Sequence, residues 1–486
     1  MTAADALRSD ARFVLIEAPG GCGKTHMACE YAREASVKLT TGKRVLVLAH
    51  TNAAVEELAR RTADLRNAVR VTTFDSLALQ LVSPYAEALG LPVPVRPGEG
   101  PGRVQYSDLS ARAADLLNRC PIIARILSAA YPIVILDEHQ DASRNQHMMA
   151  MSLRGEGSLI RAFGDPMQAI FGEDRPTWEE LIAGADIRAE LTTPHRWHEN
   201  PALGAWILQS REALKQGRKL PTETAPPSVR VLTIRGTDVG YGAGNPREYS
   251  SAIFSVPQQR AALLTAHIVN VDTLRQASGN RASVYEGSVL QHLYEAFDKL
   301  TENVGSPRQL AQTVLALLTQ TCTGLTAAYR RRIEQSLEDH RLNLGRQHTV
   351  MPLLVQLQIL YEQPSIDGVA QLARGVLAEC PAFLTFHRPA AFRILSAITS
   401  SGADPYDQLQ ESLVNYKSVT RRPNFAVGTI QRIKGLEYDH VLVFNVSKTH
   451  FKDDDYGRKL LYIAISRCRT SLTILVPETG RSPLIP

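Results

Sequence analysis

Short apolar runs alternate with helical patterns in the first part of the chain. The runs cover residues 13–17, 45–49, 69–72, 133–136 and 159–163. Such alternation is typical of a parallel sheet covered by helices. A second set of apolar runs covers residues 229–234, 427–430, 441–446 and 472–476. We therefore predict an α/β fold with two parallel sheets.

Helical periodicity interrupts both sets of runs. Residues 76–128 include a stretch rich in Pro and Gly, and residues 260–400 are mainly helical in pattern. We interpret both segments as helical insertions. The first α/β domain is then expected over residues 1–75 and 129–195, with its insertion at 76–128. The second is expected over residues 196–259 and 401–486, with its insertion at 260–400.

Composition narrows the class of protein. A chain of 486 residues is too long for one core and suggests about three or four compact units. It lacks an apolar run of the roughly 20 residues that a membrane span needs, and no apolar signal opens it. We expect a cytoplasmic protein without a membrane partner. The six cysteines form no CxxC pair, which argues against a zinc ribbon, and the net charge of +5 permits nucleic-acid binding.

A glycine-rich loop directly follows the first apolar run. Residues 18–25 read Ala-Pro-Gly-Gly-Cys-Gly-Lys-Thr, the strand–loop–helix setting of a phosphate-binding P-loop. Backbone N–H groups can turn onto phosphate oxygens at Gly20, Gly21, Cys22 and Gly23. Lys24 can reach the terminal phosphates, and the Thr25 hydroxyl can bind Mg²⁺. The loop predicts binding of a nucleoside triphosphate.

Two carboxylates follow the apolar run 133–136. Asp137 stands where a parallel strand would end beside the P-loop, so it can hold Mg²⁺ directly or through water. Glu138 can then orient and deprotonate the attacking water. The pair predicts hydrolysis of the bound triphosphate.

The segment Asp137-Glu138-His139-Gln140-Asp141 resembles the DExQD box of UvrD/Rep-type superfamily 1 DNA helicases. Six other segments resemble further motifs of that family in the right order: residues 49–54, 73–77, 164–171, 191–196, 429–439 and 461–469. The resemblance spans almost the whole chain. It implies two RecA-like P-loop domains, with ATP and Mg²⁺ as cofactors.

The resemblance also assigns roles at the nucleotide. It implies that Arg196 and Arg467 reach from the second α/β domain to the γ-phosphate, and that Gln168 senses this phosphate from the first. Glu437, in one segment with Gly435, would bind the ribose. His195 would stack on adenine, although a surface histidine is an equal alternative.

Single-stranded DNA would lie across both α/β domains. Hydroxyl, amide and backbone groups for its phosphates would come from Thr51, Asn52, Thr73 and Thr429. His50 and Phe171 could stack on bases. Phe74 is a further candidate, but Phe74 and Phe171 could equally belong to the core, which we favour for Phe74.

Several positions depart from the family pattern. Asp75 stands where the family usually has His, and Glu173 where it has a large aromatic residue that stacks on a base. Trp178 could replace that aromatic, although a buried tryptophan is the commoner outcome. No glutamine precedes the P-loop to read adenine, and the insertion 76–128 is short. Basic clusters at 330–332 and 421–422 could touch duplex phosphates or be solvated.

The sequence therefore predicts an ATP-dependent DNA translocase or helicase, and the family resemblance implies that it moves 3′→5′ on single-stranded DNA. A first alternative is a DNA-sensing regulatory ATPase that activates a partner nuclease. Compact UvrD-like chains of this size resemble the helicase subunit of anti-phage systems such as Gabija. A second alternative is a small-molecule kinase with the same P-loop, which would have no use for Arg196 or Arg467.

Overall fold

The protein forms two compact units, which we describe separately. Unit 1 comprises Met1–Ala282 and Asn424–Pro486, and unit 2 comprises Ser283–Pro423. The structure is a computed structural model. It describes residues 1–98, 103–172, 174–234, 246–285, 297, 299–338, 351–379, 385–386, 395–398, 408 and 423–486. The cluster at 421–422 and Glu173 lie outside this part of the chain.

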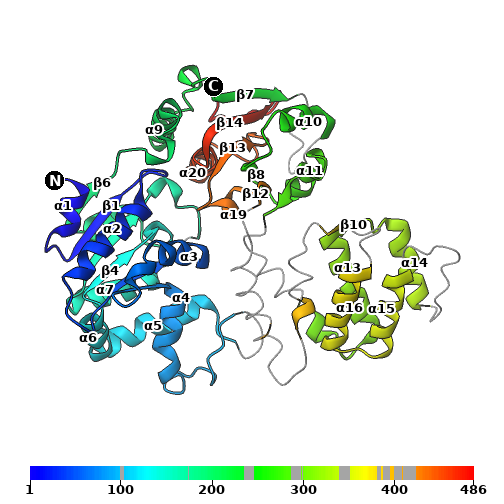
Figure 1. Ribbon diagram of the computed structural model, residues 1–486, viewed down its shortest axis with the longest axis horizontal. Coiled ribbons are helices and arrows are strands. Elements are labelled where there is room, and N and C mark those ends of the chain that lie inside the picture. Colours follow the sequence, from blue (N-terminus) through cyan, green and yellow to red (C-terminus); the bar gives the residue numbers. More distant parts are fainter. Residues whose placement is uncertain are drawn as a thin grey trace. The chain divides into compact units, whose positions relative to one another are not determined.

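The first sheet of unit 1 is parallel, with the strand order β3-β2-β4-β5-β1-β6. Figure 1 labels β1, β4 and β6 of this sheet. Its strands are β1 (Phe13–Glu17), β2 (Val45–Ala49), β3 (Val69–Thr73), β4 (Ile133–Leu136), β5 (Leu159–Gly164) and β6 (Ile187–Glu190). Five of them match the expected apolar runs. The sequence interpretation missed β6, because Ile187-Arg188-Ala189-Glu190 alternates between half-buried and exposed positions and has no apolar run.

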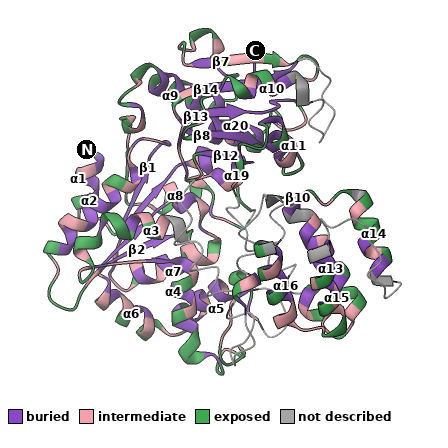
Figure 2. Ribbon diagram, turned by 45° about the vertical axis from the view of Figure 1, so that its right-hand side comes forward, coloured by how far each residue is buried: buried purple, intermediate pink, exposed green. Residues whose placement is uncertain are grey.

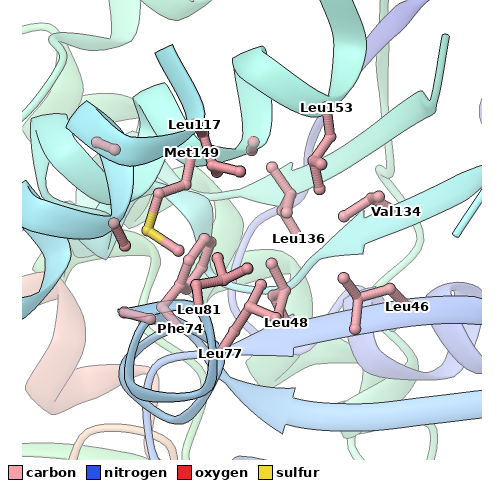
Figure 3. Close-up of a cluster of buried hydrophobic side chains, with 14 of the residues drawn as sticks. Leu46, Leu48, Phe74, Leu77, Leu81, Leu117, Val134, Leu136, Met149 and Leu153 are labelled. Atoms are coloured by element: carbon pink, nitrogen blue, oxygen red, sulfur yellow. The ribbon is translucent and has the colours of Figure 1, made fainter. Parts of the chain in front are cut away.

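Helices cover both faces of this sheet, as the alternation of side chains along each strand requires. They are α1 (Ala3–Arg8), α2 (Lys24–Val37), α3 (Asn52–Arg61), α4 (Phe74–Val82), α5 (Tyr106–Arg119), α6 (Pro121–Ala130), α7 (Arg144–Gly155) and α8 (Trp178–Gly184). Val45 and Val47 pack with α1 and α2 on one face. Leu46 and Leu48 pack on the other face, with α4, α5 and α7 (Figure 3).

The expected insertion at 76–128 is helical, but its helices share the core of the first sheet. Leu109 and Leu117 of α5 and Ala124 of α6 are buried in the same cluster as Val134 and Leu136 of β4. These helices therefore help to cover the first sheet.

The second sheet runs in the order β7-β14-β13-β8-β12 within unit 1, with parallel pairing throughout this series. Its strands are β7 (Val229–Ile234), β8 (Ala261–Thr265), β12 (Phe425–Thr429), β13 (Tyr438–Val443) and β14 (Cys468–Pro477). The associated helices are α9 (Pro201–Lys215), α10 (Pro246–Phe254), α11 (Val269–Ala277), α19 (Ile430–Ile433) and α20 (Asp455–Ile465). Figure 2 shows that strands of both sheets are largely buried.

One boundary of the second domain differs from the sequence interpretation. We assigned residues 260–400 to a helical insertion, but β8 lies between β12 and β13 in the sheet. The run Ala261-Ala262-Leu263-Leu264 contains two alanines and adjoins a helical pattern, so its apolar character did not indicate a strand. All four of these residues are fully buried.

The two sheets follow one plan. If the strands of each domain are numbered along unit 1, both sheets have the order third, second, fourth, fifth, first: β3-β2-β4-β5-β1 and β12-β8-β13-β14-β7. In parallel sheets the carboxyl ends of all strands lie at one edge, where such folds bind ligands. Positions that follow equivalent strands can therefore be compared between the domains.

Unit 2 is helical where it is described. It contains α13 (Pro307–Thr321), α14 (Ala327–Glu338), α15 (Met351–Glu362) and α16 (Ile366–Glu379), and the short strands β9 (Ser283–Val284), β10 (Cys322–Thr323) and β11 (Thr385–Phe386). Its core includes Leu310, Leu318, Leu353 and Leu357. Arg330 and Arg331 of the basic cluster are exposed on α14, and Arg330 pairs with Glu334.

Two expectations from composition concern the whole chain. The five described cysteines (Cys22, Cys29, Cys120, Cys322 and Cys468) are free. Among the described helices, none is both long and apolar enough to cross a membrane.

The assignment of β8 to the second sheet generates a stability prediction. We expect Leu264→Ala to lower the free energy of unfolding by about 2–5 kcal/mol, because it opens a cavity in a fully buried sheet. Chemical denaturation measures this change. Val269→Ala on α11, where the side chain is 51% exposed, is the control and should change the value by no more than about 0.5 kcal/mol. Equal effects of the two substitutions would contradict the burial of β8.

Candidate nucleotide and nucleic-acid site

The P-loop connects β1 to α2 through two residues in the left-handed region. Gly21 has φ 84° and Gly23 has φ 86°, conformations that favour glycine. Gly23 immediately precedes α2. Ala18 is fully buried, and its N–H donates to Gly164 O at 2.8 Å, so a short side chain fits at the first position of the loop. The strand–loop–helix form agrees with the sequence prediction, but two of the expected phosphate-binding amides are bonded within the protein. The Gly20 N–H donates to Asp165 Oδ2 and Tyr462 Oη, and the Cys22 N–H donates to Pro19 O.

The Lys24 side chain folds back onto the P-loop. Its Nζ donates to Ala18 O at 3.3 Å and pairs with Glu138 Oε1 at 3.3 Å. Only 7% of the residue is exposed. The structure thus brings the P-loop cation and the carboxylate after β4 together, although 114 positions separate them in the numbering (138 − 24 = 114).

Asp137 has the character of a metal ligand. It is buried, and among the residues that the structure describes none donates a hydrogen bond to its Oδ1. Burial, reinforced by the charge of Glu138, raises the pKa of Asp137 to about 7. An unpartnered carboxylate oxygen fits Mg²⁺, which prefers oxygen ligands and would favour the ionised form. Thr25, half-buried in the first turn of α2, is the second residue that fits.

Glu138 adopts a left-handed backbone conformation with φ 51°. Its Oε2 accepts Gln140 Nε2 at 2.8 Å. Burial opposes its ionisation, but Lys24 and then Lys434 outweigh burial and lower the pKa of Glu138. The group is therefore an ionised carboxylate able to accept a proton.

Arg467 follows α20 and is buried against the first domain. Its Nη2 donates to Gln168 Oε1 at 3.2 Å, and its Nε donates to Ile463 O at 3.0 Å. Burial and the neighbouring Arg196 lower the pKa of Arg467 to about 10, so the guanidinium stays charged at neutral pH. A Cβ on Gly20 would lie 3.5 Å from Arg467 Nη2, which places this charge at the P-loop.

Arg196 also lies against the P-loop. Its N–H donates to Gly21 O at 3.0 Å, and a Cβ on Gly21 would lie 2.9 Å from Arg196 Cβ. Its guanidinium donates to Glu437 Oε2 at 2.9 Å and to Ser466 O at 2.5 Å. Glu437 is thus at the site, bonded to Arg196 in this structure.

His195 and Gly435 occupy more open positions. His195 is exposed, and a Cβ on Gly23 would lie 3.1 Å from its Cδ2. Gly435, with φ 87°, is exposed in the turn after α19. The histidine is beside the P-loop, where a nucleotide base could reach it, and its stacking role stays a prediction.

Lys434 is a residue to which the sequence interpretation gave no role. Its Nζ contacts both Asp141 oxygens, at 2.7 and 2.6 Å, and Gln168 O at 2.6 Å. It also lies 4.9 Å from the centre of the Phe171 ring. The signal was present, because Lys434 stands inside the segment 429–439 that carried the resemblance.

Three of the threonines predicted to bind DNA end strands or begin helices. Thr51 is exposed and accepts Ala54 N at 3.1 Å, and Thr73 is buried and accepts Ser76 N at 3.0 Å. Thr429 ends β12 and precedes α19. Thr73 and Thr429 are the last residues of their strands and Thr51 lies just after β2, so all three are at carboxyl edges of the sheets; their contact with DNA stays a prediction. Asn52 opens α3, but its side chain lies outside the described part of the structure.

The structure corrects the assignment of Phe74 to DNA. Phe74 is 1% exposed and belongs to the core of the first sheet, so it cannot stack on a base (Figure 3). His50 stacks on it, with ring centres 5.0 Å apart. Burial lowers the pKa of His50 to about 3, so the imidazole is neutral. The two rings form one packed pair.

Phe171 remains available at the surface. It is 39% exposed, and Arg175 Cζ lies 5.8 Å from its ring centre. Trp178 is half-buried and donates from Nε1 to Glu17 Oε2 at 3.2 Å. Trp178 is therefore part of the packing beside β1, and Phe171 is the better candidate for stacking. Asp75 accepts Gln146 Nε2 at 3.1 Å.

The common plan of the two sheets points to a segment that the sequence interpretation missed. β8 is equivalent to β2, so Thr265 at its end and His267 just after it correspond to the segment of His50 and Thr51 after β2. Thr265 is directly paired in register with Thr429 of β12. This segment could have been found from the sequence only if residues 261–265 had been recognised as a strand.

Comparison with known families gives three matches. Residues 2–83 match an AAA domain, residues 99–173 match the UvrD/REP helicase N-terminal domain, and residues 424–475 match the UvrD-like helicase C-terminal domain. The first two cover strands and helices of the first sheet, and the third covers β12, β13 and part of β14.

Among solved structures, the chain is similar to the helicase nonstructural protein 10 of an arterivirus. The identity is 10% and the TM-score 0.36, over 97% of this chain and 61% of that one. The chain therefore spans less than two thirds of that protein. No curated protein matched the sequence.

The family matches agree with the site. The P-loop and the carboxylates after β4 fall within the AAA and UvrD/REP N-terminal matches, and Thr429, Glu437 and Arg467 fall within the C-terminal match. The chain therefore contains a UvrD/REP-like helicase N-terminal match and a UvrD-like helicase C-terminal match, and its two parallel sheets form two RecA-like α/β domains; these matches support a UvrD/Rep-type superfamily 1 helicase.

Proposed function

We propose that the protein is an ATP-dependent DNA translocase or helicase that moves 3′→5′ along single-stranded DNA. The observation that carries the proposal is the position of Arg467, which reaches from the second α/β domain to Gln168 and the P-loop of the first. A site assembled from two domains makes hydrolysis depend on their closure.

The chemistry follows from the side chains around the loop. The transferred phosphoryl group spreads negative charge over its oxygens in the transition state, so it needs nearby cations. Lys24, Arg196 and Arg467 supply them. Glu138, ionised and bonded to Gln140, is placed to accept the proton of the attacking water. Asp137 and Thr25 would hold Mg²⁺, which when bound neutralises charge on the phosphates.

DNA binding is proposed for the carboxyl ends of equivalent strands. In the first sheet Thr51 follows β2 and Thr73 ends β3; in the second, His267 follows β8 and Thr429 ends β12. Backbone and hydroxyl groups at these places suit phosphates, which position a strand without reading its sequence. Closure around ATP would then move two DNA contacts relative to each other.

The role of Arg467 generates the first functional prediction. We expect Arg467→Ala to lower kcat for ATP hydrolysis by about 10²–10³-fold, because a buried charge aimed at the transition state is lost. ADP affinity should change little, since ADP lacks the γ-phosphate that Arg467 is proposed to contact. Steady-state ATPase assays and ADP titration measure both quantities. Arg469→Ala, two positions away and half-exposed, is the control. A wild-type rate in the Arg467 variant would refute the proposal that the second domain completes the nucleotide site through Arg467.

Stimulation by DNA is the second functional prediction. Single-stranded oligonucleotide should raise ATP turnover of the full chain several-fold. Glu138→Gln should still bind ATP but block hydrolysis, and Lys24→Ala should abolish turnover, because they remove the proton acceptor and the phosphate cation. An ATP turnover rate that is the same with and without oligonucleotide would count against both DNA-dependent functions and would favour a small-molecule kinase.

A regulatory ATPase is the second candidate, and one observation favours it. Helices α5 and α6 of the short insertion are packed into the core of the first sheet. A DNA sensor that activates a partner nuclease, as in anti-phage defence, needs no separate unwinding element there. The partner and a cytoplasmic location stay predictions.

Strand displacement separates the two candidates. We expect the isolated chain to unwind a duplex that carries a 3′ single-stranded tail and to leave one with a 5′ tail intact. DNA-stimulated hydrolysis without displacement of either substrate would instead support the sensor. Displacement only from the 5′ tail would contradict the proposed polarity.

A further inference from the structure

One buried carboxylate joins four separate elements at the nucleotide site. Asp165 follows β5 and is fully buried. Its Oδ2 accepts Gly20 N at 3.1 Å, Gln168 Nε2 at 2.9 Å and Tyr462 Oη at 3.1 Å. Its Oδ1 accepts Arg211 Nε at 3.2 Å and Nη2 at 2.9 Å, and also Met167 N at 3.1 Å.

These partners come from both domains. Gly20 belongs to the P-loop and Gln168 to the segment after β5, both in the first domain. Tyr462 belongs to α20 and Arg211 to α9, both in the second. Asp165 is therefore held by side chains of the second domain while it holds groups of the first.

Tyr462 makes a second contact with the P-loop. Its hydroxyl oxygen accepts Gly20 N–H at 2.9 Å while it donates to Asp165. The Gly20 amide thus points at Asp165 and Tyr462. A Cβ on Gly20 would lie 2.9 Å from Gln168 Nε2 and 3.3 Å from the Tyr462 hydroxyl, so a side chain would disturb this arrangement.

Arg211 balances the buried negative charge. It is 6% exposed and also donates to Glu17 Oε1 at 2.5 Å, to which Lys215 Nζ donates at 2.9 Å. Burial opposes ionisation of Asp165, but Arg211 and then Lys24 outweigh it and lower the pKa of that carboxyl. The carboxylate can therefore accept its six hydrogen bonds.

The Gln168 amide is fixed from both ends. Its Nε2 donates to Asp165, and its Oε1 accepts Arg467 Nη2 at 3.2 Å. We propose that Tyr462 and Arg211 are positioning residues for ATP hydrolysis, which act through Asp165 to hold Gly20 and Gln168 in register with Arg467. The inference deepens the proposed function and rests on it for its chemistry.

Tyr462→Phe tests the inference with the full chain. It removes one hydroxyl and keeps the ring, so kcat should fall roughly tenfold, equivalent to about 1.4 kcal/mol. ADP affinity and stoichiometry should stay within about twofold. Tyr131→Phe is the control, because its hydroxyl is bonded to Arg70 at 2.7 Å just before β4, at the opposite end of the strands from the P-loop. An unchanged kcat, or a loss of active sites in proportion to kcat, would overturn the inference.

Arg211→Lys tests the shared route through Asp165. Lysine keeps the charge but lacks the fork that bonds Asp165 and Glu17 together, so kcat should again fall. Tyr462 and Arg211 act through one carboxylate in this proposal. The kcat of the double variant should therefore be no more than about twofold below that of the less active single variant. Multiplying effects would show independent roles and contradict the proposal.

A measurement without nucleotide separates this inference from the proposed function. Hydrogen exchange at the Gly20 amide should be several-fold faster in Tyr462→Phe than in the wild type or in Tyr131→Phe. Equal exchange in all three proteins would overturn the inference, whatever the ATPase result. Faster exchange in Tyr462→Phe, combined with a wild-type chain that hydrolyses no ATP, would leave the contact supported and the proposed function refuted.

Discussion

The close approach of the P-loop backbone to the second α/β domain is the constraint on which the nucleotide site depends. A Cβ on Gly21 would lie 2.7 Å from the Trp197 ring, and Trp197 in turn donates from Nε1 to Cys468 O at 2.7 Å. Backbone and aromatic ring meet without a side chain between them. The positions of Arg196 and Arg467 depend on this contact, because both residues flank the same interface. They would lie near a bound phosphate only when the P-loop and the second domain are in contact.

The common plan of the two sheets suggests how this interface would serve both proposed ligands, nucleotide and DNA. The carboxyl edge of the first sheet carries the P-loop after β1 and the carboxylates after β4. The strands β2 and β3 of the same sheet end in the segments proposed for DNA. Nucleotide and DNA would therefore contact one rigid set of strands, so a shift of the second sheet on closure would act on both.

The sequence predicted those parts of the structure whose cause is local. Apolar runs gave five strands of the first sheet, and the glycine and lysine spacing gave the P-loop. β6 and β8 were missed, because one is polar and exposed on alternate residues and the other is rich in alanine. The resemblance brought Arg196 and Arg467 to the site, where the structure places them beside Gly21 and Gly20.

Contacts between distant residues could not be predicted from local patterns. His50 follows a strand as expected, but only the fold shows that its ring packs on Phe74. Tyr462 and Asp165 are 297 positions apart, and neither has a neighbour in the chain that indicates the other. Such pairs depend on where α9 and α20 lie against the P-loop, which is a property of tertiary packing.

The energetics of Asp165 favour a role in geometry over one in stability. Taking Asp165 and Arg211 out of water costs free energy that their attraction only partly recovers, so a buried pair of this kind adds little net stability. Its six hydrogen bonds nevertheless fix the carboxylate in one orientation, and a misplaced partner would leave a buried charge unsatisfied. If the protein works as proposed, the Asp165 contacts would favour one closed geometry at the P-loop while adding little to the net stability of the closed state. A motor that reopens after each hydrolysis would need that combination.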